Sequence, residues 1–298
     1  MKKGNIPVYD LCSLQQQEQR QQDDIIVEPF AAYLQRHPNL FIPHRHTFYH
    51  LVLFTAGSGS HTIDFEQFTL VQGQIYFMIP GQVHSWQFGD DVDGYVVNFS
   101  ETFISAFLRR DHYLEQFPFL EGIAAHSVID LAPEAAATAA RLLKSMLEES
   151  LDKGHWYEDR MRLYLLELFI LSHRNSTKQL PSGNQNNDLV LRNFRKLVEQ
   201  HYTTLHMPKD YAALLYITPN HLNALCKDLL GKPAGEVIRD RILLEAKRLL
   251  VNAALNISEI AWQLNFADNS YFTKFFKKQT GTTPEAFRKA VTAPVQNR

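Results

Sequence analysis

The sequence predicts an α+β protein of more than one domain, with a β-barrel and two helices first and an all-α part after them. Three observations lead to this prediction. Short runs rich in Val, Ile, Phe and Tyr fill residues 28–99, helical composition begins at Pro133, and one helix-turn-helix pattern occurs twice in the last hundred residues. With 298 residues, the chain is long enough for two or three separate cores.

The first part of the chain predicts an arm followed by a barrel. Residues 1–27 are polar and rich in glutamine, which is typical of an N-terminal arm without a core of its own. From residue 28, strand-length runs are separated by turn signals such as Pro80-Gly81, at a spacing typical of an antiparallel barrel or sandwich. We expect a barrel whose clearest strands are His50–Thr55, Ser60–Asp64, Gln74–Ile79 and Gly94–Phe99.

Two helices are expected after the barrel, at Pro133–Ser150 and Glu158–Arg174. The second is apolar almost all round, so packing on one surface would not cover it. It is either a buried core helix or a helix that packs on its barrel and on a second copy of itself. We expect the second arrangement, and therefore a homodimer, with an interface formed by Met161, Leu165, Leu168 and Phe169.

Residues 175–187 are polar, contain Pro and Gly, and predict a flexible linker. The charge changes across it. Residues 188–298 contain 16 Lys and Arg against 10 Asp and Glu, whereas the rest of the chain contains 14 against 22. This distribution indicates that the C-terminal part is the one that meets polyanions.

The repeated pattern spans Asp210–Gly231 and Ser258–Gly281. Each copy predicts a short helix, a break, a capping residue (Thr218 or Asp268) and a second helix that ends in Lys and Gly. Such a pair places its second helix in the major groove of DNA. A helix before the repeats, Leu189–His201, and one between them, Gly235–Asn252, complete the domain; the latter is about 27 Å long, close to one DNA turn.

Helical spacing divides the residues of the two recognition helices. Leu222, Leu225 and Cys226 in the first, and Phe272, Phe275 and Phe276 in the second, should face the core. The remaining positions would face DNA, where Asn and Lys can contact base edges and terminal residues can hold phosphates. These candidate DNA-binding residues are Asn220, His221, Asn223, Ala224, Lys227, Asn269, Ser270, Tyr271, Thr273, Lys274, Lys277 and Lys278.

Residues 189–288 resemble the DNA-binding domain of the AraC/XylS family of transcription regulators. The resemblance rests on the Ser-Tyr-Phe, Phe-Lys, Gly-x-x-Pro and Phe-Arg elements between Ile260 and Arg288. It implies base contacts by Asn220, Asn223 and Ala224, and by Asn269, Ser270, Thr273 and Lys274.

The chain departs from the family pattern at several positions. Ala224 and Lys274 stand where the family often has Arg, Cys226 where it often has Phe, and Asn265 where it often has a turn Gly. Loss of Arg at position 224 removes a bidentate donor, so the first repeat should discriminate less between sequences. Asn at position 265 tolerates the left-handed conformation, so that change is mild.

The barrel contains a histidine pattern that resembles a cupin, with His44-x-His46 on one strand and His84 on a later one. His50 stands closest to where the cupin carboxylate would be. Such a set could serve a catalytic metal, a regulatory pocket or a hydrogen-bonded barrel mouth. Because the family resemblance implies an effector and rarely a metal, we expect no metal and no cofactor, and an effector site formed by His44, His46, Tyr49, His50, His84 and Trp86.

Together these patterns predict a cytoplasmic, non-enzymatic transcription regulator. The predicted domains are a cupin-like effector-binding and dimerisation domain at 28–174 and an AraC-type DNA-binding domain at 188–298. Its partners would be double-stranded DNA, an unidentified small-molecule effector and a second copy, with RNA polymerase a further candidate and no membrane. The start of the chain lacks a signal-peptide pattern, no long apolar run occurs, and the two cysteines, Cys12 and Cys226, lie far apart. The alternatives are a cupin metalloenzyme fused to a DNA-targeting domain and a constitutive regulator whose barrel only dimerises.

Overall fold

A computed structural model describes residues 7–14, 23–38, 41–89, 91–105, 113–175, 185–252 and 254–292. It divides into two compact units, one within Pro7–Lys178 and one within Gln179–Arg298. Much of the expected arm (1–27) and most of the expected linker (175–187) lie outside the described residues.

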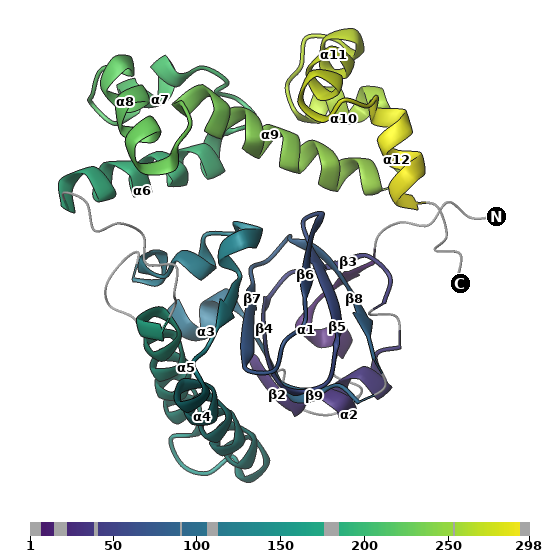
Figure 1. The fold of residues 1–298 in the computed structure, drawn as a ribbon, viewed down its shortest axis with the longest axis vertical. Coiled ribbons are helices and arrows are strands. Elements are labelled where there is room, and N and C mark those ends of the chain that lie inside the picture. The colour runs from purple at the N-terminus through teal and green to yellow at the C-terminus, as the bar shows by residue number, and fades with distance from the viewer. Residues whose placement is uncertain are drawn as a thin grey trace. The chain divides into compact units, whose positions relative to one another are not determined.

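The described strands of the first unit form two five-stranded sheets that face each other as a barrel (Figure 1). The first sheet has the order β1 (Val8–Tyr9), β3 (His44–His46), β8 (Val83–Phe88), β5 (Gly59–Ile63) and β6 (Glu66–Thr69). The second has the order β10 (Val128–Asp130), β7 (Gln74–Met78), β4 (Tyr49–Ala56), β9 (Asp93–Phe99) and β2 (Ile25–Pro29). The four strands expected from the sequence are present, with ends shifted by one residue at most.

Period-2 alternation sends successive residues of β4 to opposite faces of the second sheet. Val52 and Phe54 belong to the core between the two sheets, whereas Leu51 and Leu53 belong to the core on the outer face. Both faces of this sheet are therefore buried, which explains why the run reads as almost continuously apolar.

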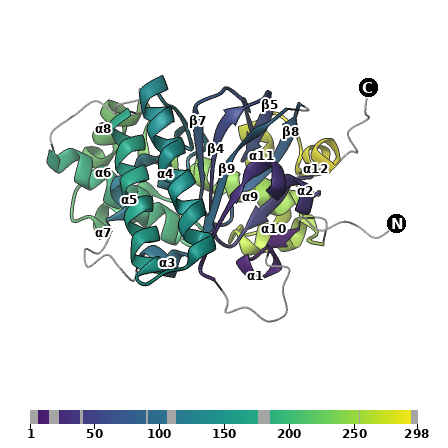
Figure 2. The same cartoon turned by 90° about the horizontal axis from the view of Figure 1, so that it is seen from below.

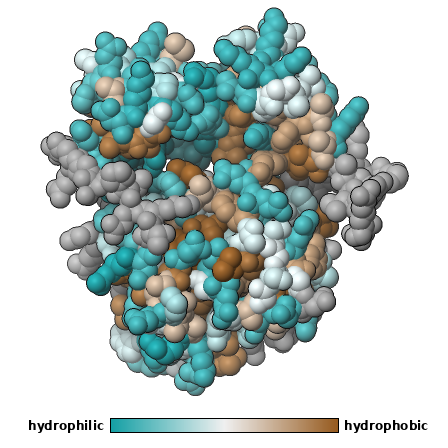
Figure 3. Space-filling model, in the orientation of Figure 1, coloured by the Kyte–Doolittle hydropathy of each residue, from teal (hydrophilic) through white to brown (hydrophobic). Residues whose placement is uncertain are grey.

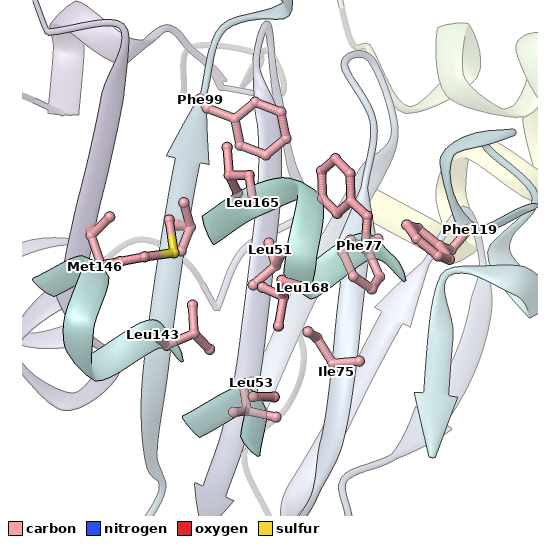
Figure 4. Close-up of a cluster of buried hydrophobic side chains, with 14 of the residues drawn as sticks. Leu51, Leu53, Ile75, Phe77, Phe99, Phe119, Leu143, Met146, Leu165 and Leu168 are labelled. Carbon is pink, nitrogen blue, oxygen red and sulfur yellow. The ribbon is translucent and has the colours of Figure 1, made fainter. Parts of the chain in front are cut away.

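Two long helices, α4 (Pro133–Asp152) and α5 (Tyr157–Asn175), lie side by side and cover the outer face of the second sheet (Figure 2). Leu165 and Leu168 point from α5 towards the strands, among Leu51, Phe77 and Phe99 (Figure 4). A minor part of the first unit consists of α1 (Leu11–Leu14), α2 (Phe30–Arg36), α3 (Glu101–Ser105) and three 3-10 turns (Leu114–Gln116, Pro118–Leu120 and Ala124–His126).

The prediction for the interface residues of α5 is corrected here. Met161, Leu165, Leu168 and Phe169 are all fully buried within their own unit. They are core residues because this face of α5 packs on the sheet. The large apolar side chains left exposed on α5 are Leu163 and Ile170.

The second unit is all-helical in its described residues. Its helices are α6 (Gln185–His201), α7 (Pro208–Leu214), α8 (Pro219–Leu230), α9 (Ala234–Val251), α10 (Ile257–Gln263), α11 (Asn269–Thr280) and α12 (Pro284–Thr292). The central helix is α9, whose Ile238, Ile242, Ala246 and Leu250 are buried at the expected helical spacing. Arg241 of α9 donates to both carboxylate oxygens of Glu199 on α6, at 2.6 and 2.7 Å, and thereby ties α6 to it.

Among the described helices, none is both long and apolar enough to cross a membrane.

Candidate functional site

The two helix-turn-helix units begin their second helices in the same way. The Thr218 hydroxyl accepts the His221 N–H at 3.2 Å before α8, and an Asp268 carboxylate oxygen accepts the Tyr271 N–H at 2.7 Å before α11. Both are the capping residues expected from the sequence. Each cap satisfies a backbone N–H that would otherwise lack a partner, which holds the start of the recognition helix in place.

The same two helices also end alike. Gly231 and Gly281 follow α8 and α11 in the left-handed region, with φ of 71° and 77°. Both backbone N–H groups bond back to a Lys carbonyl, from Lys227 and Lys277, at 3.0 and 2.8 Å. Glycine adopts this conformation without the steric cost that a β-carbon imposes.

The turns inside the two units match as well. Asn265, in the second helix-turn-helix unit, has φ of 57°, as expected for the residue that replaces the family's turn glycine. Its counterpart in the first helix-turn-helix unit is Tyr216, with φ of 55° and a side chain that is 96% exposed. A left-handed, solvent-exposed tyrosine is uncommon, and sequence reasoning did not single it out.

The core-facing prediction for the recognition helices is confirmed with one nuance. Leu222, Leu225, Cys226, Phe272 and Phe276 are buried, while Phe275 is half-buried at the edge of the same core.

Nearly all candidate DNA-binding residues are exposed, and Asn223 and Thr273 are half-buried. Asn223 also has a structural role, because its side-chain oxygen accepts the Ala234 N–H at the start of α9, at 3.1 Å. One acceptor position of this oxygen is therefore already occupied within the protein. Trp262 on α10, which is 80% exposed, is a further exposed aromatic residue that the sequence analysis did not select.

Within the second unit, α8 and α11 lie towards opposite ends of α9 (Figure 1). The surface over these two helix-turn-helix units is mainly hydrophilic in the view of Figure 3. Two capped helices with polar exposed faces, held apart by one rigid helix, suit the reading of two neighbouring segments of a groove.

The second candidate site is a cluster of five buried histidines between the two sheets. His44 and His46 come from β3, His84 from β8 and His61 from β5, all in the first sheet, while His50 comes from β4 in the second. Cross-strand pairing brings His44 and His84 together, because they lie opposite each other in the first sheet. In the second sheet, His50 lies opposite Asn98.

Two aromatic residues of the expected effector site lie on different faces of the barrel wall. Trp86 is buried beside the cluster and stacks on His61, with ring centroids 3.2 Å apart. Tyr49 is placed elsewhere: it precedes His50 on β4, so it points to the opposite face, where it stacks on Phe99 at 5.1 Å. Tyr49 therefore does not share the histidine cluster.

Sequence reasoning also missed two members, His61 and Asn98. His61 lies opposite Trp86 on the neighbouring strand, and Asn98 lies opposite His50. Alternation along the predicted strands Ser60–Asp64 and Gly94–Phe99 gives each a face, but only the pairing of strands distant in sequence shows that these faces meet the histidines.

Burial controls the charge of the cluster. It lowers the pKa of His44 to about 4 and of His50 to about 3, and it lowers the pKa of His46, His61 and His84 well below the usual value. The neighbouring rings add to the effect, since one protonated imidazole disfavours a second. At neutral pH the cluster therefore consists of uncharged imidazoles.

Comparison with known proteins follows the same division into two units. A family model described as the AraC-like ligand binding domain matches residues 29–165, and one described as a helix-turn-helix domain matches residues 211–290. This chain belongs to the AraC family. It is a transcription regulator with a ligand-binding domain and a DNA-binding helix-turn-helix domain.

Named relatives match the chain along most of its length. The HTH-type transcriptional activator RhaR of Yersinia pestis bv. Antiqua (strain Angola) is 23% identical over 266 residues, covering 87% of this chain and 88% of that protein. RhaR of Cronobacter sakazakii (strain ATCC BAA-894) is 23% identical over 260 residues, covering 85% and 89%. Among solved structures, unsaturated fatty acid bound ToxT from Vibrio cholerae strain SCE256 is 14% identical and covers 90% of this chain and 96% of that one, with a TM-score of 0.44.

Proposed function

We propose that this AraC-family chain acts as a cytoplasmic, non-enzymatic homodimer that binds two successive major-groove segments in each half-site and responds to a small ligand in its barrel. The observation that carries the proposal is the pair of matched helix-turn-helix units. Their recognition helices have equivalent caps, equivalent left-handed ends and polar exposed faces.

Base reading is assigned to the exposed polar residues near the starts of both helices. Asn269, Ser270 and Lys274 of α11 are exposed, so they are free to approach base edges. In α8, Asn220 and His221 are exposed, whereas the oxygen of Asn223 is already used within the protein. The second helix-turn-helix unit should therefore contribute more of the sequence discrimination, and the first helix-turn-helix unit should contribute more through contacts to the DNA backbone.

Dimerisation is assigned to the exposed face of α5. Leu163 and Ile170 are 55% and 41% exposed and lie seven residues apart, so they share one face of the helix. Trp156, immediately before the helix, is 67% exposed. Exposed apolar side chains of this kind fit a second copy of the same helix better than they fit water, and the exposed Glu167 between them can remain at the edge of such a contact.

The barrel is assigned to ligand binding because a buried polar cluster lies in the part of the chain that matches the ligand-binding family model. The relatives are named transcriptional activators, which favours activation and RNA polymerase as a further partner for this chain.

The direct test is footprinting of the full-length chain on DNA upstream of its own gene and of neighbouring genes. We expect two protected major-groove windows about 10 bp apart in each half-site. One window alone would show that only one unit engages DNA. An effector that changed neither the affinity nor the footprint would refute the coupling between barrel and DNA, and would favour the constitutive alternative.

A further inference from the structure

The histidine cluster has the composition and geometry of a metal site. In the described residues, His44, His46 and His84 form one group in which a ring nitrogen of each lies within 4.8 Å of the others. All three side chains are buried, with exposed fractions of 0%, 3% and 2%. Their rings are packed closely, with centroids 4.2 to 4.9 Å apart.

The outer hydrogen bond of His44 prepares the ring for a ligand role. Its Nδ1 lies 2.8 Å from the carbonyl oxygen of Ile42, which can only accept, so Nδ1 carries the proton. The lone pair therefore resides on Nε2, which is buried and has no hydrogen-bond partner. Histidines that bind metals are usually oriented in this manner by a backbone carbonyl.

His50 is prepared in the same way from the opposite sheet. Its Nδ1 lies 2.5 Å from the side-chain oxygen of Asn98, again an acceptor, which leaves the lone pair on a buried and unpartnered Nε2. The His50 ring is 4.9 Å from that of His46 and 5.5 Å from that of His84. It is the nearest further nitrogen donor to the group of three.

His61 gives His84 an outer partner. His61 Nε2 lies 3.1 Å from His84 Nδ1, and the His61 ring is held by its stack on Trp86. When His84 Nδ1–H donates to His61, the His84 Nε2 lone pair is free, and this nitrogen is also buried without a partner. A cation beside His84 would select this tautomer.

Buried nitrogen acceptors without hydrogen-bond partners destabilise the folded protein unless a ligand or water contacts them. Water could fill part of that role, but neutral imidazoles whose ring nitrogens lie within 4.8 Å of one another are a donor set that suits zinc and similar transition metals. Magnesium and calcium prefer oxygen donors, and no carboxylate joins the described group.

We propose that His44, His46 and His84 bind one divalent transition-metal ion of the zinc class inside the barrel, with His50 beside it. The inference replaces the metal-free site expected from the sequence. It rests on the proposed function in one respect, since it names the chemical class of ligand that the ligand-binding unit takes. A site with three protein ligands keeps a position open for a fourth ligand, such as an oxygen of a small molecule.

The first experiment measures metal binding by the full-length chain, independently of DNA. Protein stripped with EDTA is dialysed and titrated with Zn²⁺, and with Co²⁺ as a visible probe of coordination. We expect one equivalent per chain by elemental analysis, Co²⁺ absorption bands that Zn²⁺ displaces, and a rise in Tm on Zn²⁺ addition. Absence of stoichiometric binding of Zn²⁺, Co²⁺, Ni²⁺ and Cu²⁺ would overturn the inference.

Variants locate the ion. His46→Gln and His84→Gln should each weaken Co²⁺ binding by about 100-fold or more, the upper end of the loss seen when a supporting residue is removed. His155→Gln is the matched control, because His155 lies in the same unit but is exposed. If one ligand variant fails to fold, the other still decides. Unchanged Co²⁺ spectra and stoichiometry in a folded ligand variant would place the ion elsewhere and refute the assignment.

DNA binding separates this inference from the proposed function. If the metal binds without changing operator affinity, the metal site is correct but the metal is not the regulatory signal. The opposite outcome is a protein that binds no metal but whose operator affinity changes with an organic ligand. The regulator is then ligand-responsive and the metal inference fails.

Discussion

At the scale of single residues, Tyr216 and Asn265 occupy equivalent left-handed turn positions at different cost. Asn tolerates this region, whereas a residue with a bulky side chain pays about 1–2 kcal/mol for it. Tyr216 has φ of 55° and almost no contact that would compensate, since its side chain is 96% exposed.

Tyr216→Asn should therefore raise the free energy of unfolding of the helical unit by about 1 kcal/mol, and Asn265→Ala should lower it by a similar amount. Urea unfolding of the full chain, followed by far-UV circular dichroism, measures both. A loss of stability in Tyr216→Asn would contradict the strain argument. If the stabilised variant bound the operator more weakly, Tyr216 would be shown to contribute to DNA binding.

The buried histidines predict acid sensitivity of the barrel. Burial holds the folded-state pKa of His44 at about 4 and of His50 at about 3, below the ordinary value near 6.5 that applies after unfolding. Below pH 6.5 the unfolded chain thus binds more protons, so stability falls as pH falls, by at most about 1.4 kcal/mol per pH unit for each histidine.

The measurement is thermal unfolding with EDTA between pH 7.5 and about 5, above the range where most carboxylates titrate. We expect Tm of the barrel unit to decrease steadily below about pH 6.5. Replacing His44 by Gln should reduce the steepness of this dependence, because four other buried histidines remain, and the exposed-site variant His155→Gln should leave it unchanged. A flat profile in the unmodified chain would mean that the histidines are not buried as neutral rings.

At the scale of elements, each recognition helix has a capped start, a left-handed glycine after its end, and a buried core face separate from its exposed polar face. Lys274 lies on the exposed face of α11, less than two turns after the Asp268 cap. Lys274→Ala should cost about 1–3 kcal/mol on the preferred operator and relax specificity there if the side chain reads a base. Equal weakening on all sequences, with a salt slope reduced by about 1, would assign it to a phosphate instead.

Fluorescence anisotropy with operator and scrambled DNA at several salt concentrations distinguishes these outcomes. Lys144→Ala is a suitable control, because Lys144 is 68% exposed but lies on α4 in the other unit. A comparable loss in the control would point to a general charge effect.

At the scale of the whole molecule, the exposed apolar side chains of α5 predict the oligomeric state. Leu163→Glu together with Ile170→Glu should convert a dimer to a monomer, because charges would be buried at the interface. Light scattering after size exclusion reports the mass. Val71→Glu, at a site 52% exposed in the same unit, is the control and should leave the dimer intact. A dimer that survives the double change would move the interface to another surface.

Much of the fold could be predicted from local sequence patterns alone. The helix-turn-helix repeats, their caps at Thr218 and Asp268, the connecting helix α9 and the main strands all depend on residues near one another in sequence. Capping, left-handed glycines and period-3.6 burial are local effects, so the sequence by itself determined them.

Tertiary structure alone decided which residues share a site. Local periodicity predicted that α5 is apolar almost all round, but only packing showed that Met161 and Leu165 face the sheet while Leu163 faces outward. Likewise, His61 joins the histidine cluster, and Tyr49 leaves it, through the register of strands that are distant along the chain. Side-chain direction on a strand is local, but the partner that it meets depends on which strands pair, and that is a property of the folded sheet.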